Sequence, residues 1–535
     1  MLFPMPGYRL WDSLMTATSI TYFEETPWRV MLYFAHNLVI PITRLFDILL
    51  PGGDPMMVTA LRETVFSAFN VALIYLFFRH YLKQNLPAII IALAYIFCKS
   101  HWRFTTGGEE KDIMLVLNII FMIGFFQLRG WFDSGIKNFS SPEQKPNINI
   151  VAFLKNHFPE IMLGIILAFA IMIHLENGLL ILTIPVVYLF DRKFYGNIRK
   201  DLTEVFTIMF TAGSILFVWF SVLIFGINEI STLSGAVRWL LEYHYSGEYF
   251  DTKVTFIKQY VHAYSGFRRF IIGKYFEHNL LWLESIFITV GTLILAIRSY
   301  KYSPQITRLA LIYLTFITIH FFFWLPWDPE QWNPVVFVGF LILAPGIFAK
   351  KNKLVNYSML ALVGCLAIIN FTTHIQQAQK YSTIHDLNRS QNIDYQGGIN
   401  SHFLKDIPYP NMVQFINTKI ESNSIILVEK RHVANHFLMY TSHIPTVIKY
   451  LDKNENILKR KYYLSQLSLW FYKPKYSSDE LKDILKFGNR NIYYLSSKSP
   501  DRTNILEKLN AKSEFIYSIG LRNFVLYQLR PSDLL

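Results

Sequence analysis

The sequence predicts an α-helical polytopic membrane protein with about ten transmembrane helices and a C-terminal extracytoplasmic α/β domain. Three observations lead to this fold class. The 535 residues are 52% hydrophobic with a mean hydropathy of +0.27, which is too apolar for an ordinary soluble protein. Apolar runs of helical length follow one another through the middle of the chain. The loops between these runs alternate between two chemically different sets.

The two sets of loops predict the orientation of the helices. One set is short and basic, and such loops stay in the cytoplasm. The other set carries the carboxylates, histidines and tryptophans, so every candidate reactive side chain is expected on the outer face. The basic loops are 79–83, 129–155, 191–200, 298–308 and 350–353, and the polar loops are 99–112, 174–177, 228–279 and 327–333.

The chain divides into three predicted parts. Residues 1–56 lack a clean apolar run and form an outer-face interfacial segment with an acidic loop. Residues 57–373 form the transmembrane helical domain, and residues 374–535 form the extracytoplasmic domain. The expected spans are 57–79, 86–99, 113–129, 158–173, 177–190, 204–227, 279–297, 308–325, 333–349 and 354–373.

The C-terminal part alternates strand-like and helix-like segments, which is typical of a small α/β domain. The strand-like segments are Ser424–Val428, Asn491–Leu495, Phe515–Ile519 and Asn523–Tyr527. The helix-like segments are Met412–Glu421, Val433–Tyr440 and Ser478–Phe487. This domain follows the last span and is therefore expected on the outer face.

Composition excludes several function classes. The net charge of +13 comes mainly from loops and the polar tail, so it favours orientation and contact with anionic headgroups over nucleic acid. Cys98 and Cys365 both lie in apolar segments and indicate neither a disulfide framework nor a metal site. The sequence has no phosphate-binding P-loop, no Rossmann glycine motif and no GxSxG elbow.

Polar residues in the expected outer loops carry a family resemblance. Asp12 lies early in the chain, and His36 precedes Pro41. In order and spacing these elements, with loops 100–112, 173–178 and 324–334, resemble the GT-C superfamily of polytopic glycosyltransferases. The resemblance is closest to bacterial members with an RgtA/B/C/D-like or family-39-like domain. It covers most of residues 8–372 as architecture, although its motifs are loose.

The resemblance implies a glycosyltransferase of a bacterial inner membrane. Its donor is a sugar on a polyprenyl phosphate, and its acceptor is a lipid or glycan on the extracytoplasmic face. Asp12 takes the place of the first-loop acid and is the candidate catalytic base. Two departures stand out: Met15 and Thr16 replace a second acid, and the family's first transmembrane helix has no counterpart. The missing helix is explained either by a start of the protein upstream of Met1 or by a real difference from the family. The alternative for Asp12 is a structural role as the cap of a short helix.

Candidate ligands of the donor phosphate are cationic. Arg268 and Arg269 form a guanidinium pair that matches phosphate oxygens, and Arg103 and Lys111 lie in the second polar loop. The alternative for the arginine pair is a basic amphipathic helix on anionic headgroups.

The remaining polar candidates are acceptor contacts or structural groups. They are His36, Glu109, Glu110, His174, Glu176, Asp328 and Glu330. Solvated turns, or acids at a helix N-terminus, are the alternative explanation for each carboxylate. No cofactor is assigned. A divalent metal held by His and Glu side chains is left open, because their spacing fits no specific site.

Three functional hypotheses follow. The first is the glycosyltransferase that the resemblance implies. The second is a polysaccharide polymerase, ligase or flippase-like membrane protein, although the sequence has neither the internal repeat nor the broken helices common in transporters. The third is a catalytically inactive relative that acts as a scaffold.

Overall fold

The computed structural model describes most of the helical part of the chain and five short strands. The described residues are 16–17, 20, 37–50, 55–108, 110–131, 157–190, 198–227, 229–240, 256–272, 281–323, 332–350, 352–389, 425–428, 470–472, 492–496, 514–519 and 524–529.

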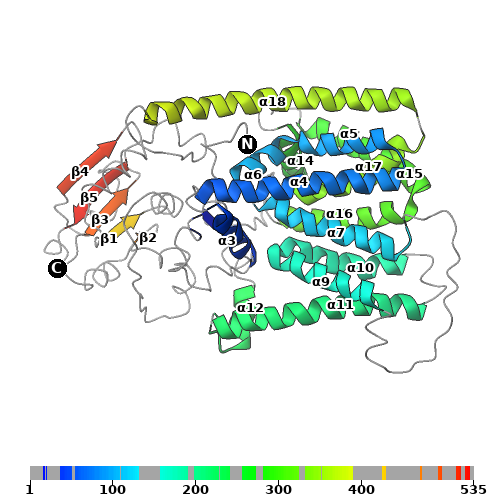
Figure 1. Cartoon of the computed structure of the whole chain (residues 1–535), viewed down its shortest axis with the longest axis horizontal. Helices are drawn as coiled ribbons and strands as arrows, with labels where there is room; N and C mark the ends of the chain where they lie inside the picture. Colours follow the sequence, from blue (N-terminus) through cyan, green and yellow to red (C-terminus); the bar gives the residue numbers. More distant parts are fainter. Residues whose placement is uncertain are drawn as a thin grey trace.

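Long helices lie side by side in a bundle (Figure 1). Each of the ten apolar segments expected from the sequence contains one of them. They are α4 (Pro55–Leu82), α5 (Asn85–Ile96), α7 (Lys111–Leu128), α9 (Phe158–Ile173), α10 (Leu179–Phe190), α11 (Ile198–Ser221, continued by the π-helix η3, Val222–Ile227), α15 (Leu281–Tyr302), α16 (Pro304–Phe323), α17 (Asn333–Phe348) and α18 (Lys353–Arg389).

Five segments among the described residues are long and apolar enough to cross a membrane. They belong to α4, α7, α11, α15 and α18. Four of the others, α5, α9, α10 and α17, have 12 to 16 residues and are short for an apolar layer of ~30 Å. Crossing by all ten helices therefore remains a prediction.

Further helices among the described residues connect or flank these ten. They are α3 (Val39–Leu49), α6 (Lys99–Gly107), the 3-10 helix η1 (Leu175–Gly178), α12 (Leu233–Leu240) and α14 (Phe256–Ile272). Helix α3 buries Val39 and Ile40 but exposes Leu45, Ile48 and Leu49, as expected of a helix at an apolar interface. It is the longest described part of the predicted interfacial segment 1–56.

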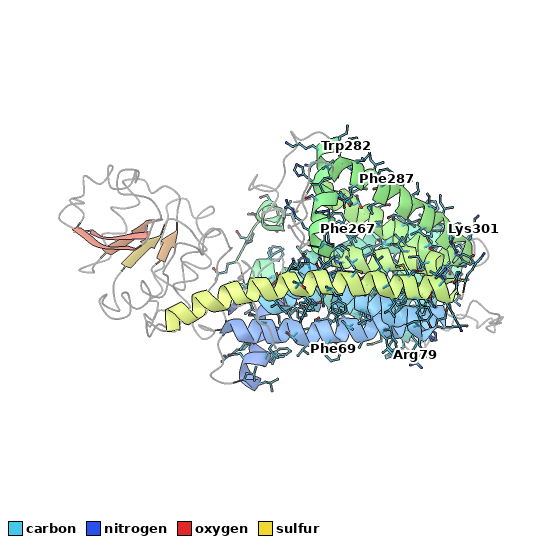
Figure 2. The ribbon with its side chains drawn as sticks, turned by 90° about the horizontal axis from the view of Figure 1, so that it is seen from above. Phe69, Arg79, Phe267, Trp282, Phe287 and Lys301 are labelled. Carbon is cyan, nitrogen blue, oxygen red and sulfur yellow. The ribbon has the colours of Figure 1, made fainter. Side chains whose placement is uncertain are left out.

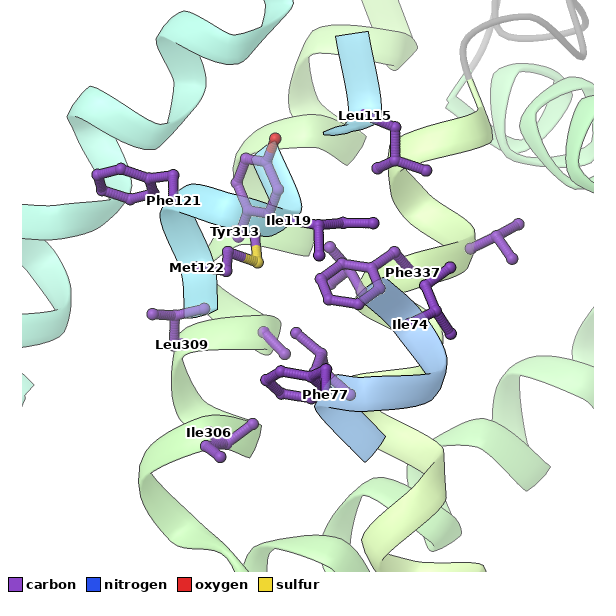
Figure 3. Packing of buried hydrophobic residues seen from close by; sticks show 14 of the residues in the cluster. Ile74, Phe77, Leu115, Ile119, Phe121, Met122, Ile306, Leu309, Tyr313 and Phe337 are labelled. Carbon is purple, nitrogen blue, oxygen red and sulfur yellow. The ribbon is translucent and has the colours of Figure 1, made fainter. Parts of the chain in front are cut away.

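The interior of the bundle is an apolar core built from helices far apart in the sequence (Figure 3). Phe77 of α4 packs against Phe337 of α17, with ring centroids 5.8 Å apart. Ile119 of α7 and Tyr313 of α16 belong to the same buried cluster. In contrast, α11 and α15 turn many apolar side chains outward, among them Phe210 and Phe217 of α11 and Trp282 and Phe287 of α15. Such faces suit contact with lipid.

The helix ends that flank the basic loops gather at one end of the bundle, which we call the basic end. Gln84 donates to the Phe348 carbonyl at 3.1 Å, and Arg308 donates to the Phe190 carbonyl. Figure 2 places Arg79 and Lys301 at this same end. The opposite end carries α3, α6, α12 and α14, and we call it the polar end (Figure 1). This segregation agrees with the alternation of loops in the sequence.

Helix α18 extends into the predicted C-terminal segment as far as Arg389, and the described residues after it form a five-stranded sheet. Its strands are β1 (Ile425–Val428), β2 (Trp470–Tyr472), β3 (Ile492–Ser496), β4 (Glu514–Ile519) and β5 (Phe524–Leu529), in the order β2-β1-β3-β5-β4. Strands β2, β1 and β3 are parallel, and β3, β5 and β4 are antiparallel. The sequence predicted four of these strands and missed β2. The helices predicted between them lie outside the described residues, so an α/β domain remains a prediction.

The contact between α9 and α11 generates the first testable prediction. A Cβ atom at Gly164 would come within 2.6 Å of the Thr211 Cβ and 2.8 Å of the Ile208 carbonyl oxygen. We therefore expect Gly164→Ala to destabilise the protein by ~1–3 kcal/mol through overpacking. Thermal unfolding of the purified protein in detergent checks this.

Gly213 of α11 is the matched control, because a Cβ atom there would meet nothing within 4 Å. Gly213→Ala should leave the unfolding temperature unchanged or raise it, since alanine favours a helix by ~0.5–1 kcal/mol over glycine. Equal behaviour of the two variants would contradict the close packing of α9 on α11.

Candidate functional site

Polar side chains buried among α4, α6, α7 and α17 form a connected network at the polar end. Its largest fully buried side chain is that of Arg62 in α4. The Arg62 guanidinium donates to Glu63 Oε1 at 2.8 Å, to Thr43 Oγ1 at 2.5 Å and to the Gly108 carbonyl at 2.9 Å. One cation thereby ties α3 and the turn after α6 to α4.

Glu63 continues the network toward α7. Its Oε2 accepts a hydrogen bond from the backbone N–H of Asp112 at 2.8 Å, while its Oε1 accepts from Arg62. The Glu63 carboxylate therefore lies at the first turn of α7, where the helix dipole favours a negative charge. A buried pair of this kind is stable only when its remaining hydrogen-bonding groups also find partners, as they do here.

Asp112 accepts hydrogen bonds from three side chains of the network. Its Oδ1 accepts from Asn70 Nδ2 at 3.1 Å and from Tyr95 OH at 3.0 Å, and its Oδ2 accepts from Thr105 Oγ1 at 2.8 Å. Three donors to one carboxylate satisfy a charge that has no access to water. Asp112 therefore serves as an anchor for α4, α5 and α6.

His101 of α6 lies between Ser67 and Asp112. Its Nε2 is 2.9 Å from Ser67 Oγ, and its Nδ1 is 3.5 Å from Asp112 Oδ1. Burial lowers the pKa of His101 below its ordinary value, and the Asp112 charge opposes this shift. The imidazole is therefore neutral at pH 7, which suits a ring enclosed against Tyr95 at a centroid distance of 4.3 Å.

The turn between α6 and α7 is held along its backbone. Arg62 binds the Gly108 carbonyl, Asn333 Nδ2 donates to the Lys111 carbonyl at 2.9 Å, and Asn70 donates to the Asp112 carbonyl at 2.9 Å. Gly108 has a φ of +79°, and a Cβ there would lie 2.5 Å from Thr59 Oγ1. Only glycine fits this position without strain.

This turn carries three of the residues singled out in the sequence. Glu110 and Lys111 are buried, with exposed fractions of 1% and 2%, so the turn directs both charges into the protein. Glu109 lies outside the described residues. Two buried ionisable groups on a restrained turn at one end of an apolar bundle are typical of a functional site.

Two further candidates lie on α14 beside α6. Ser100 Oγ donates to the Arg269 carbonyl at 3.2 Å, which attaches α6 to the last turns of α14. Arg268 donates through Nε to Glu284 Oε1 at 3.0 Å, so the Glu284 carboxylate partly neutralises the Arg268 guanidinium. Arg103 lies on α6, one turn after Lys99.

His174 and Glu176 flank the start of η1. The backbone N–H of Glu176 donates to His174 Nδ1 at 3.3 Å, and Glu176 Oε2 is 3.8 Å from the same nitrogen. Nearby, Asn177 donates to the Ala170 carbonyl at 2.8 Å and accepts from Asn118 at 3.1 Å. These bonds hold the short turn between α9 and α10.

Several predicted residues lie outside the described residues. They are Asp12, His36, Glu109, Asp328 and Glu330. Among the described residues, no three His, Cys, Asp or Glu side chains lie together in a way that could hold a metal ion.

Sequence analysis missed most of the buried network. Arg62, Glu63, Asn70 and Asn333 were treated as parts of apolar spans. The sequence did carry one signal of this network, namely two adjacent charged residues inside an apolar helix. Such charges are costly in a membrane and generally face a polar interior. Arg62 and Glu63 form such a pair within α4. Their partners could not be found without the tertiary fold.

The Arg62–Glu63 pair generates the second prediction. Arg62→Met leaves Glu63 buried without its cation, which costs ~3–5 kcal/mol when one partner of a buried pair is removed. We expect a large fall in the unfolding temperature in detergent, partly restored in the double variant Arg62→Met/Glu63→Gln, which removes the orphaned charge.

The control for this prediction is the more exposed pair Arg44–Asp47 on α3, whose side chains are 29% and 18% exposed. Arg44→Met should cost only ~0–1 kcal/mol, as is usual for surface ion pairs. If Arg62→Met were as mild as Arg44→Met, the network would not hold the polar end together.

Comparison with known proteins identifies the fold. No family model matches the chain, and no curated protein sequence matches it. The structure of ArnT from Cupriavidus metallidurans bound to undecaprenyl phosphate aligns with a TM-score of 0.56 at 11% identity, over 98% of this chain and 95% of ArnT. ArnT in the apo state aligns with a TM-score of 0.55 at 11% identity, over 99% and 95%.

A weaker likeness is to the Archaeoglobus fulgidus oligosaccharyltransferase tethered with an acceptor peptide. It has a TM-score of 0.46 at 11% identity, over 92% of this chain and 65% of that protein. The alignment with ArnT, in contrast, extends along nearly the whole of both chains. The chain therefore has the fold of ArnT.

Proposed function

We propose that this protein is a membrane glycosyltransferase that moves a sugar from a polyprenyl-phosphate donor to a lipid or glycan acceptor. The reaction takes place at the extracytoplasmic face of a bacterial cytoplasmic membrane. The observation that carries the proposal is the buried network of Arg62, Glu63 and Asp112. It restrains a turn bearing Glu110 and Lys111 at the end of the bundle opposite the basic loops.

The arrangement of polar and apolar surfaces supports a lipid-linked donor. ArnT, whose fold this chain shares, has been crystallised with undecaprenyl phosphate. The outward apolar faces of α11 and α15 suit the hydrocarbon layer in which an isoprenoid tail would lie. A phosphate at the end of that tail would meet the polar end of the bundle.

The proposed reaction is a single displacement. The acceptor hydroxyl attacks the anomeric carbon, the bond from that carbon to the phosphate oxygen breaks, and the polyprenyl phosphate leaves with the electron pair. Asp12 takes the hydroxyl proton as general base. Arg103, Lys111, Arg268 and Arg269 stabilise the charge that develops on the leaving phosphate.

The other polar residues are proposed to bind the acceptor or to support the site. They are His36, Glu109, Glu110, His174, Glu176, Asp328 and Glu330. The close approach of His174 and Glu176 favours a supporting role for that pair. A divalent metal is not required by this scheme, because cationic side chains balance the phosphate charge.

The third prediction concerns transfer itself. The donor substrate is a radiolabelled hexose linked to undecaprenyl phosphate. Purified protein in nanodiscs should transfer the hexose to membrane lipids or glycans and release undecaprenyl phosphate. Asp12→Asn should lower the rate by ~100-fold or more, as is usual when a general base is lost. Chromatography of the labelled product measures the rate.

Asp47→Asn is the control, since Asp47 pairs with Arg44 on α3 and has no proposed role in catalysis. It should transfer the hexose at the wild-type rate. Wild-type transfer by Asp12→Asn would remove Asp12 as the base, and the absence of transfer by the wild-type protein with every sugar tried would contradict the proposed function.

The fourth prediction concerns orientation. Leu233 of α12 is 77% exposed at the polar end, and Lys301 is exposed at the basic end. In a chain with Cys98→Ser and Cys365→Ser, a membrane-impermeant maleimide should label Leu233→Cys in intact cells. It should label Lys301→Cys only after the cells are permeabilised. The opposite labelling pattern would place the turn that carries Glu110 in the cytoplasm and contradict the proposed orientation.

A further inference from the structure

Lys99, at the start of α6, is a buried cation that the network described above does not use. Its side chain is only 5% exposed. Within the described part of the chain, its Nζ atom is buried without a hydrogen-bond partner. Burial lowers the pKa of Lys99 to about 8, so the amine is still mainly protonated at pH 7. An unpaired buried ammonium is costly, and proteins rarely keep one without a use for it.

Lys99 lies at the junction of α6 and α14. Asn370 of α18 donates to both the Phe97 carbonyl at 2.6 Å and the Ile271 carbonyl at 2.7 Å. One residue after Lys99, Ser100 donates to the Arg269 carbonyl. The backbone of Lys99 is thus held between two attachments to the last turns of α14.

The two helices at this junction carry an excess of positive charge. Neither α6 nor α14 contains an aspartate or a glutamate, whereas together they carry five lysines and arginines: Lys99, Arg103, Lys258, Arg268 and Arg269. The carboxylate of Glu284 on α15 pairs with one of them, Arg268. A pair of helices of this composition suits a dianionic or monoanionic ligand better than a neutral sugar.

We propose that Lys99 is a ligand for a phosphate group that binds at the junction of α6 and α14. Arginine binds phosphate through its two-pronged guanidinium, and lysine acts as a point charge on the same group. A phosphate monoester carries about 1.5 to 2 negative charges at pH 7 and would compensate the Lys99 ammonium. The group is either the phosphate of the polyprenyl carrier or free phosphate. The first case rests on the proposed function.

The experiment compares stability with and without ligand. The unfolding temperature is measured for full-length wild-type, Lys99→Met and Lys99→Gln proteins in phosphatidylcholine nanodiscs. Each protein is heated without ligand, with undecaprenyl phosphate, with inorganic phosphate and with undecaprenol. Without ligand, both variants should be at least as stable as the wild type, because an unpaired buried charge has been removed. The affinity for the phosphate ligand should fall about tenfold or more, which corresponds to about 1.4 kcal/mol.

The ligand arms identify the source of the phosphate. Stabilisation of the wild type by both undecaprenyl phosphate and inorganic phosphate supports a site for phosphate itself. Stabilisation by undecaprenyl phosphate alone supports a lipid-linked group. Equal stabilisation by undecaprenol overturns the proposal, since the lipid tail would then be the ligand.

Lys301→Met is the control, because it removes the same charge at the basic end and should leave the affinity unchanged within about twofold. Undiminished affinity in Lys99→Met overturns the proposal. So does a Lys99→Met protein that is less stable than the wild type without ligand, because Lys99 would then support the fold. Binding is measured without transfer, so a phosphate site at Lys99 can stand even if no sugar is transferred.

Discussion

The polar end of this protein depends on one buried cation. Arg62 lies inside an apolar helix bundle, where a guanidinium without partners would be strongly destabilising. Its three hydrogen bonds to Glu63, Thr43 and Gly108 explain why α3, α4 and the turn after α6 come together. Through Glu63 the same pair also holds the first backbone amides of α7.

This arrangement links folding to the proposed chemistry. A transferase that handles a charged lipid carrier needs charged side chains at the edge of an apolar layer, and those side chains must not relax into water. Here the turn that carries Lys111 is attached to α17 through Asn333 and to α5 through the bond of Asp112 with Tyr95. The cost of burying polar groups is offset by mutual hydrogen bonds, which leaves Lys99 as the unusual member of the polar end.

The composition of the chain explains the separation of the two ends. At the basic end, Arg129 binds Asp201 at 2.7 Å and Glu204 at 3.0 Å. At the polar end, Glu63 accepts from a backbone amide, and Asp112 accepts from the hydroxyl groups of Tyr95 and Thr105. The charge pattern thus separates the two ends and concentrates the restrained turns at one of them.

Hydrophobic runs and loop charge by themselves determined the positions of the ten bundle helices and the grouping of the loops, although they gave the region of α14 as a polar loop. Both properties are local, since ~20 apolar residues and a basic turn can be recognised without knowing their neighbours. Four of the five described strands were also found, but the three residues of β2 were too few to give a pattern. Only the tertiary structure decided that Arg62, Asn70 and Asn333 act together. Arg62 donates to the Gly108 carbonyl 46 positions away and Asn70 to the Asp112 carbonyl 42 positions away. Asn333 donates to the Lys111 carbonyl 222 positions away, and no local pattern encodes such pairs.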